Sequence, residues 1–172
     1  RGLTAGQKPV LINFNIPATP AEGYDAALQA WEIEVFGTTD LNAFRYLTGQ
    51  VTIDGATQPG GRSAGPKIIL IGPGSGQKTG LNLGENQTQG GNTIRGLGMQ
   101  RFDPHINVNS DDNTIEDCWF GLSSDGTTLT SGDDAEPEDG SGVALQSTAD
   151  RNTIHENRFA GFFGASVAIR GE

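Results

Sequence analysis

The stretch that decides the fold is Asn92–Phe120, NTIRGLGMQRFDPHINVNSDDNTIEDCWF, which contains one repeat unit and the start of the next. Asn-Thr-Ile begins the unit at residue 92, begins it again at residue 113, and begins a third copy at residue 152. The spacings between these copies are 21 and 39 residues. A regular period of this size is typical of proteins built from stacked repeats, in which each unit packs on its neighbours.

The residues inside each copy indicate short β-strands. Every copy has two or three runs of β-branched or aromatic residues with alternating polarity, separated by Gly, Asn, Asp and Ser. The Leu-x-x-Leu-x-Leu pattern of leucine-rich repeats, which have a similar period, is absent. The sequence therefore predicts an all-β chain, a single-stranded parallel β-helix (solenoid) of about five coils with long loop insertions.

Aligning the copies assigns a role to each position. We expect the Asn column to form a hydrogen-bonded ladder at a corner, with the Thr column facing outward and the Ile column facing inward. The ladder residues are Asn92, Asn113, Asn152, Thr93, Thr114 and Thr153. A further outward column contains Arg95, Glu116 and His155, which favours a surface charge ladder over a metal or acid–base site.

Two segments of one domain are predicted. Residues 1–50 would form N-terminal strands and a partial cap, and residues 51–172 would form the regular coils. Strands are expected at 10–16, 31–35, 51–53, 68–71 and 81–83, and one or two helical turns at 23–30. The Trp31–Val35 strand should place both of its Glu side chains outward.

The copy that begins at Asn113 carries an insertion, Ser123–Gly142, with a dense acidic run. Its acidic residues are Asp133, Asp134, Glu136, Glu138 and Asp139. Oxygen ligands at this density suit Ca²⁺, but the run lacks the spacing of an EF-hand, so a solvated loop is the favoured interpretation and calcium stays an alternative. No other cofactor is expected.

Composition excludes several partners. The 172 residues include 26 Gly, only 34% are apolar, and the formal net charge is −10, which argues against binding nucleic acid or an anionic membrane. No run of 18 apolar residues is present, so no membrane span is expected. The single cysteine, Cys118, is predicted to be a core residue. The start at Arg1 without Met indicates a processed product.

Four segments resemble one group of proteins. They are Val51–Gly60 (VTIDGATQPG), Ile12–Pro17, Asn92–Leu97 with Arg101-Phe102, and Phe120–Thr127. Over residues 10–172 the chain is similar to secreted bacterial right-handed parallel β-helix repeat proteins, many of which are long surface proteins. The resemblance implies a right-handed coil and an extracellular or cell-surface location. Its motifs are structural rather than catalytic.

No catalytic constellation is evident in the sequence, so an enzyme is not expected. Asp111-Asp112 is the sole acidic pair at a corner where β-helix lyases and hydrolases carry their carboxylates, and a turn role is favoured for it. The alternative function is a carbohydrate-binding or polysaccharide-cleaving (lyase-like) β-helix, with Trp119 as a sugar-stacking platform. A Trp119–Arg158 cation–π stack is the preferred interpretation of that residue.

The main functional expectation is an extracellular structural or adhesive module. Its last coil should expose strand edges and apolar side chains, which would be covered by another copy, head to tail, or by downstream coils of the same precursor. The residues assigned to this contact are Leu11, Phe14, Phe159, Phe162, Val167 and Ile169. A head-to-tail contact that does not close would give a fibre.

Overall fold

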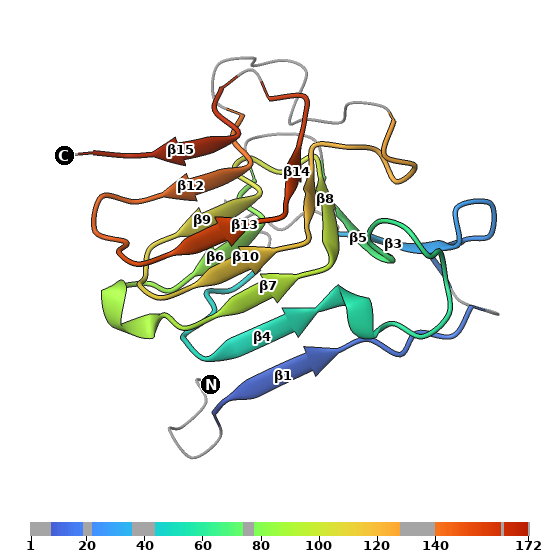
Figure 1. Cartoon of the computed structure of the whole chain (residues 1–172), viewed down its shortest axis with the longest axis horizontal. Helices are drawn as coiled ribbons and strands as arrows, with labels where there is room; N and C mark the ends of the chain where they lie inside the picture. The colour runs from blue at the N-terminus through green and yellow to red at the C-terminus, as the bar shows by residue number, and fades with distance from the viewer. Residues whose placement is uncertain are drawn as a thin grey trace.

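The computed structural model describes residues 8–18, 22–35, 44–73, 78–127, 140–162 and 164–171. Within these ranges the chain forms β-strands joined by turns (Figure 1), and two short 3₁₀ turns, η2 (Gly55–Thr57) and η3 (Gln87–Gln89), are its only helical segments. The prediction of an all-β chain with parallel strand pairing is confirmed.

The described strands form three sheets. The first contains, in spatial order, β1 (Val10–Asn13), β4 (Val51–Asp54), β7 (Thr93–Arg95), β10 (Thr114–Glu116) and β13 (Thr153–His155). The second contains β14 (Arg158–Phe159), β11 (Trp119–Phe120), β8 (Leu97–Gln100), β5 (Ile68–Ile71), β3 (Ala30–Glu34) and β2 (Tyr24–Asp25). The third contains β15 (Val167–Ile169), β12 (Val143–Leu145), β9 (Ile106–Val108) and β6 (Leu81–Leu83).

Successive strands visit the three sheets in a fixed order. β7, β8 and β9 belong to the first, second and third sheets, and so do β10, β11 and β12, and then β13, β14 and β15. We call each such set of three strands a repeat, and the set β13–β15 the last repeat. Neighbouring repeats pair in register: Ile115 lies opposite Ile94 on one side and Ile154 on the other. The alignment of the copies therefore matches the pairing of their strands.

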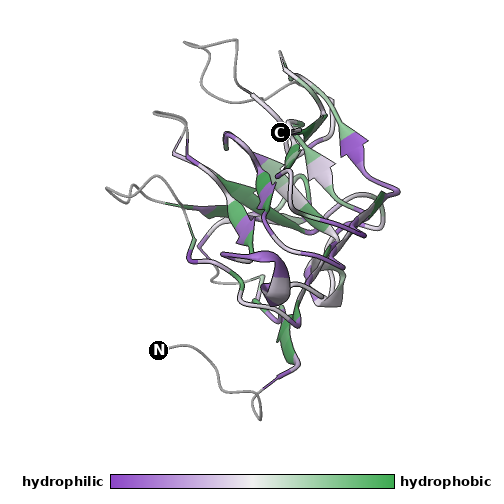
Figure 2. Ribbon diagram, turned by 90° about the vertical axis from the view of Figure 1, so that its left-hand side faces the viewer, coloured by the Kyte–Doolittle hydropathy of each residue, from purple (hydrophilic) through white to green (hydrophobic). Residues whose placement is uncertain are grey.

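The apolar core lies between the sheets. Alternate strand positions point inward, and the inward Ile94 and Ile115 are at most 1% exposed. Figure 2 shows hydrophobic segments on the strands through the middle of the molecule and hydrophilic residues at many of the turns. The largest fully buried side chains include Trp31, Phe102, Phe120, Ile68, Leu83, Leu97, Met99 and Ile106.

The expectation of helical turns at residues 23–30 is wrong. Tyr24–Asp25 forms β2, which pairs antiparallel with β3 and is the edge strand of the second sheet. The Asp25 carboxylate accepts hydrogen bonds from the backbone N–H groups of Ala27 and Leu28, and this side-chain turn reverses the chain before it can propagate a helix. β2 nevertheless covers the outer edge of β3.

The first strand is shorter than expected. It ends at Asn13 rather than Ile16, because side chains replace the neighbouring strand as hydrogen-bond partners. The Phe14 N–H donates to Thr57 Oγ1 at 2.9 Å, and the Ile16 N–H donates to Gln58 Oε1 at 2.9 Å. Gln58 Nε2 donates back to the Ile16 carbonyl at 2.8 Å. The Val51–Gly60 motif thus clamps the segment that follows β1.

Candidate functional site

The outer edge of the last repeat is the main candidate site. β13, β14 and β15 are terminal strands of their sheets, and no strand of the described ranges pairs with their far side. Figure 1 shows the last repeat at the opposite end of the stack from β1. Unpaired N–H and C=O groups on a strand edge are templates for a further strand.

Apolar side chains accompany this open edge. Ile169 lies opposite Leu145 in the parallel register, so it continues an inward column, yet it is 80% exposed because no strand of the described chain lies beyond it. Val167 lies opposite the buried Val143 and is itself only half-buried. Phe159 and Phe162 are also half-buried and pack against the core. The expected inward direction of Val167 and Ile169 fits this register.

The other two residues assigned to the contact lie at the opposite end. Leu11, in β1, is 61% exposed, and Phe14 is half-buried against the core. This end is less open than the last repeat. β2 covers β3 in the second sheet, and Leu47 pairs in parallel with Leu83 beside β6 in the third, so β1 presents the free strand edge there.

The three asparagines form a continuous hydrogen-bonded ladder. Asn113 Oδ1 accepts from the backbone N and from Nδ2 of Asn92, at 3.0 and 2.8 Å. Asn152 Oδ1 accepts the same pair from Asn113, at 2.9 and 2.8 Å. The aligned residue in the preceding strand is Val51, whose N–H donates to Asn92 Oδ1 at 3.2 Å. The Thr column lies beside this ladder, with Thr93, Thr114 and Thr153 in register.

The outward charged column forms ion pairs along the first sheet. Arg95 pairs with the carboxylates of Asp54 and Glu116, and Glu116 also contacts His155 Nε2 at 2.9 Å. These side chains therefore pair with one another across neighbouring strands, which stabilises the sheet. In the described ranges no group of three or more His, Cys, Asp or Glu side chains has a geometry that could hold a metal ion. The acidic run, including Asp133, Asp134, Glu136, Glu138 and Asp139, lies outside the described residues.

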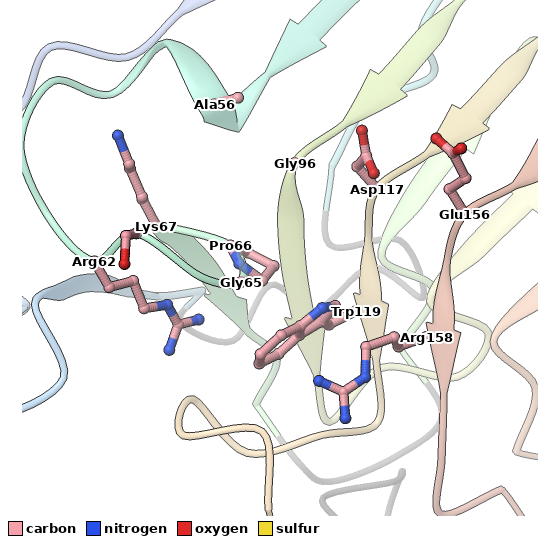
Figure 3. Close-up of a pocket in the computed structure, with 11 residues that line it drawn as sticks. Ala56, Arg62, Gly65, Pro66, Lys67, Gly96, Asp117, Trp119, Glu156 and Arg158 are labelled. Carbon is pink, nitrogen blue, oxygen red and sulfur yellow. The ribbon is translucent and has the colours of Figure 1, made fainter.

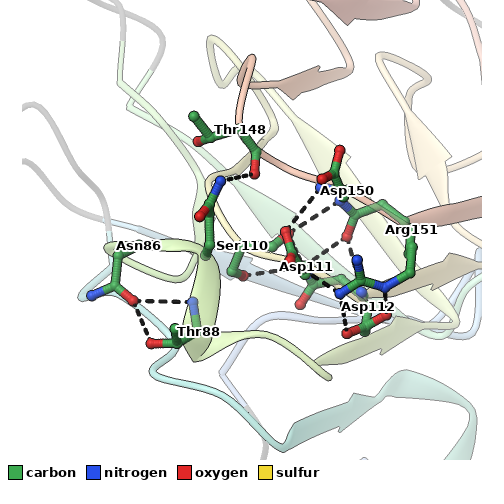
Figure 4. A network of polar contacts seen from close by, with 11 residues as sticks. Asn86, Thr88, Ser110, Asp111, Asp112, Thr148, Asp150 and Arg151 are labelled. Atoms are coloured by element: carbon green, nitrogen blue, oxygen red, sulfur yellow. Dashed lines mark hydrogen bonds and ion pairs between the residues drawn. The ribbon is translucent and has the colours of Figure 1, made fainter.

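Asp111 and Asp112 have a structural role in a corner (Figure 4). Arg151, from the next repeat, holds Asp112 side-on through Nε and Nη2 at 2.7 and 3.0 Å, and contacts Asp111 at 3.1 Å. The hydrogen bonds from Arg151 lower the pKa of Asp112, which favours its ionised form as a hydrogen-bond acceptor. Asp112 has φ 58°, as expected for a turn position.

The two buried nucleophile or base candidates are core residues. Cys118 is fully buried, and burial raises the pKa of its thiol to about 12, which leaves the reactive thiolate unpopulated. His105 is also fully buried, and burial lowers its pKa to about 4. His155 lies on the outer face, with its side chain 43% exposed, so the two histidines lie in different environments.

A cavity of about 410 Å³ lies on the outer side of the second sheet, beside Trp119 (Figure 3). The Arg158 guanidinium carbon lies 4.5 Å from the Trp119 ring centroid, which confirms the predicted cation–π stack. A second cation, Arg62, lies 5.1 Å from the same centroid. The sequence analysis did not identify Arg62, because it lies in the loop between η2 and β5 and has no counterpart in the other copies of the repeat.

No family model, curated protein or solved structure matches this chain. Among the described residues, no helix is long and apolar enough to cross a bilayer.

Proposed function

We propose that the chain is a right-handed parallel β-helix of about five coils, acting outside the cell as a structural or adhesive module that stacks head to tail. The proposed architecture is supported by the fixed order in which the strands visit three sheets and by the in-register parallel pairing of their residues. The role proposed for it is non-catalytic.

The observation that carries this proposal is the open edge of the last repeat. It combines three parallel strands whose outer edges have no partner among the described strands with Ile169 at 80% exposure. A strand edge of this kind gains both hydrogen bonds and apolar burial when another strand is added. The inner repeats indicate the effect of adding a strand. The positions that correspond to Val167 and Ile169 are both buried in β9, and in β12 one is buried and the other half-buried.

The end of a second copy that carries β1 is the proposed occupant. Ile12 lies in register with Ile53, so it begins the Ile column that Ile154 ends within the described strands. Placing β1 of one copy beside β13 of another would continue that column with an isoleucine. Ile12 is 39% exposed, which leaves it able to make this contact. β2 and Leu47 occupy the corresponding edges of the other two sheets, so we expect backbone pairing to run through the first sheet. Val167 and Ile169, in the third sheet, would contribute apolar packing against the other copy.

Sedimentation velocity over a range of concentrations, combined with negative-stain images, tests this function. We expect the chain to form linear assemblies that persist in high salt, because backbone hydrogen bonds and apolar burial are little screened. Ile169→Lys should shift assembly to at least tenfold higher concentration while leaving the fold intact, since this side chain is mostly exposed in the single chain. Val167→Lys should act in the same direction.

Ala64→Lys is the matched control, because Ala64 is exposed in the loop between η2 and β5, on the side of the stack. It adds the same charge and should leave assembly unchanged. A wild-type chain that stays monomeric at high concentration would contradict the proposal and favour coverage of the edge by further coils of the same polypeptide. A dimer that does not grow would also contradict it, because head-to-tail contacts remain open at each end.

A further inference from the structure

The cavity beside Trp119 is formed between the loop 58–67 and the outer side of the last two repeats. Residues 58–67 link η2 to β5 and extend over the outer side of the second sheet, where Arg62 and Lys67 line one wall. Asp117, Trp119, Glu156 and Arg158 come from the corners and strands of the last two repeats. A volume of about 410 Å³ is within the range of small-molecule sites. It lies on the outer side of the second sheet, and one of its lining residues, Arg158, belongs to β14 of the last repeat.

The cavity is preorganised around the Trp119 ring. A Cβ atom at Gly65 or at Gly126 would collide with that ring, so glycine backbones hold it closely from two loops. Both glycines have positive φ, near 78° and 76°, which makes other residues unfavourable there. Arg158 and Arg62 both lie within 5.1 Å of the ring centroid. The ring and its two cations therefore form a fixed wall.

Arg62 has an unused binding edge. Its Nη1 donates to the Ser124 carbonyl, while Nε and Nη2 are buried and have no hydrogen-bond partner among the described residues. Nε and Nη2 form the side of a guanidinium that takes a carboxylate with two parallel hydrogen bonds. Arg151 uses this same edge for Asp112 in this chain. A buried donor pair without acceptors costs free energy, which a bound carboxylate would recover.

The opposite wall carries acidic side chains at costly backbone positions. Asp117 and Glu156 occupy the corner where the preceding repeat has Gly96, and all three have positive φ, at 52°, 56° and 65°. The shared left-handed backbone places Asp117 and Glu156 at equivalent corners of successive repeats, so both carboxylates face the same side of the stack. Figure 3 shows Asp117 and Glu156 across the cavity from Lys67 and Arg62. Carboxylates accept hydrogen bonds from ligand hydroxyl groups.

We propose that this cavity binds a sugar acid, with its carboxylate toward Arg62, Lys67 and Arg158 and its hydroxyl groups toward Asp117 and Glu156. Of the side chains that line the cavity, three are cationic and two are acidic, and the carboxylates of Asp125 and Glu32 also lie near Arg62. A sugar acid presents one carboxylate to the cations and several hydroxyl groups to the acidic side chains. A neutral sugar would offer the cations no carboxylate, and an amino acid such as glutamate would offer Asp117 and Glu156 no hydroxyl group.

Tryptophan fluorescence tests the proposal directly. Trp119 lines the cavity, whereas the other tryptophan, Trp31, is 2% exposed in the core, so a ligand-dependent change reports on the site. We expect glucuronate to change the emission with saturation, and glucose and glutamate to bind at least tenfold more weakly. Arg158→Gln should weaken glucuronate binding at least tenfold, and Trp119→Phe should remove the signal. Binding should weaken with added salt.

Arg101→Gln is the matched control, because Arg101 is exposed and, among the described residues, donates to the Pro73 carbonyl and does not line the cavity. It should leave binding unchanged. Arg62→Met removes the Nε and Nη2 donors that have no partner. If that variant fails to fold, Lys67→Met removes the other cation of the same wall. The absence of saturable binding, equal affinity for glucose or glutamate, or undiminished affinity in Arg158→Gln would each overturn the proposal. Assembly at the open edge is measured separately, so either result leaves the other testable.

Discussion

At the scale of single residues, the asparagine ladder does more than join neighbouring turns. Asn113 is 1% exposed and uses both ends of its amide: Oδ1 accepts from Asn92, and Nδ2 donates to Asn152 and to the Ser110 carbonyl. Each repeat therefore depends on the side chain of the next one to satisfy backbone N–H groups inside the stack. An aspartate at this position could accept hydrogen bonds but would lack the Nδ2 donors, so only an amide can make both sets of bonds.

Asn113→Ala should lower the free energy of unfolding by about 1–3 kcal/mol, because it leaves buried donors on Asn92 without an acceptor. Urea unfolding followed by circular dichroism measures this loss. Thr127→Ala is the control, since Thr127 is exposed and its bonds to described residues stay within its own turn, to Asp125. Comparable losses for both variants would count against the ladder as a stabilising element.

His105 makes stability depend on pH. Its ring is fully buried among the edges of Phe102, Phe120 and Phe162, with centroids 5.2–6.1 Å away, and Nε2 has no hydrogen-bond partner in the described structure. Burial holds the folded-state pKa at about 4, below the ordinary value of 6.5. The folded state therefore binds fewer protons than the unfolded state between these pH values, and stability falls as the pH is lowered through them.

The contribution of His105 should be complete above about pH 7 and should fall by about 3 kcal/mol by pH 4. Urea midpoints at pH 7.5 and pH 4.5 measure the change. His105→Phe keeps an aromatic ring in the cage without a titrating group, so its pH dependence should be smaller by most of that amount. An identical pH dependence in His105→Phe would show that other groups, not His105, produce it.

At the scale of elements, the Val51–Gly60 motif acts as a clamp between β1 and β4. Gln58 is 1% exposed, and its amide both accepts from the Ile16 N–H and donates to the Ile16 carbonyl. It thereby imitates the pairing that a neighbouring strand would offer. This gives the Gln of the motif a physical function and ends β1 at Asn13.

Gln58→Ala should release the segment 14–17 from the stack and lower the free energy of unfolding by about 1–3 kcal/mol. Hydrogen exchange of the Ile16 amide measures the release directly, since that N–H loses its acceptor. Gln87→Ala is the control, because Gln87 is exposed and makes its side-chain hydrogen bond on the surface. Unchanged protection at Ile16 in Gln58→Ala would rule out the clamp.

The sequence could predict those contacts whose residues recur at the same position in each copy of the repeat. The Ile column was predictable, because Ile94 and Ile115 follow the same tripeptide pattern and pairing in register needs only the period. β2 was not predictable, since it depends on a single turn in which the Asp25 side chain accepts hydrogen bonds from the backbone. The Trp119 cavity was also hidden. It depends on Arg62 meeting a loop 62 residues away, at Ser124, and no periodic pattern marks that contact.

At the scale of the whole molecule, burial is uneven along the stack. Ile94 and Ile115 are at most 1% exposed, whereas Ile154, in the same column, is only half-buried. Amide protection in hydrogen exchange should therefore be highest in β7–β9 and lowest in β13–β15 at low protein concentration. Assembly should raise protection selectively in β13–β15. Uniform protection along the stack, unchanged by concentration, would contradict both the gradient and the proposed contact.

The coverage of β3 by β2 has a consequence for the order of events during synthesis. It covers the outer edge of β3 with residues that are synthesised before most of the strands of that sheet. Each later repeat then finds a finished surface to add to, and pairs with a strand made only a few tens of residues before it. The nascent chain can thus fold in the direction of translation, with one growing face at a time.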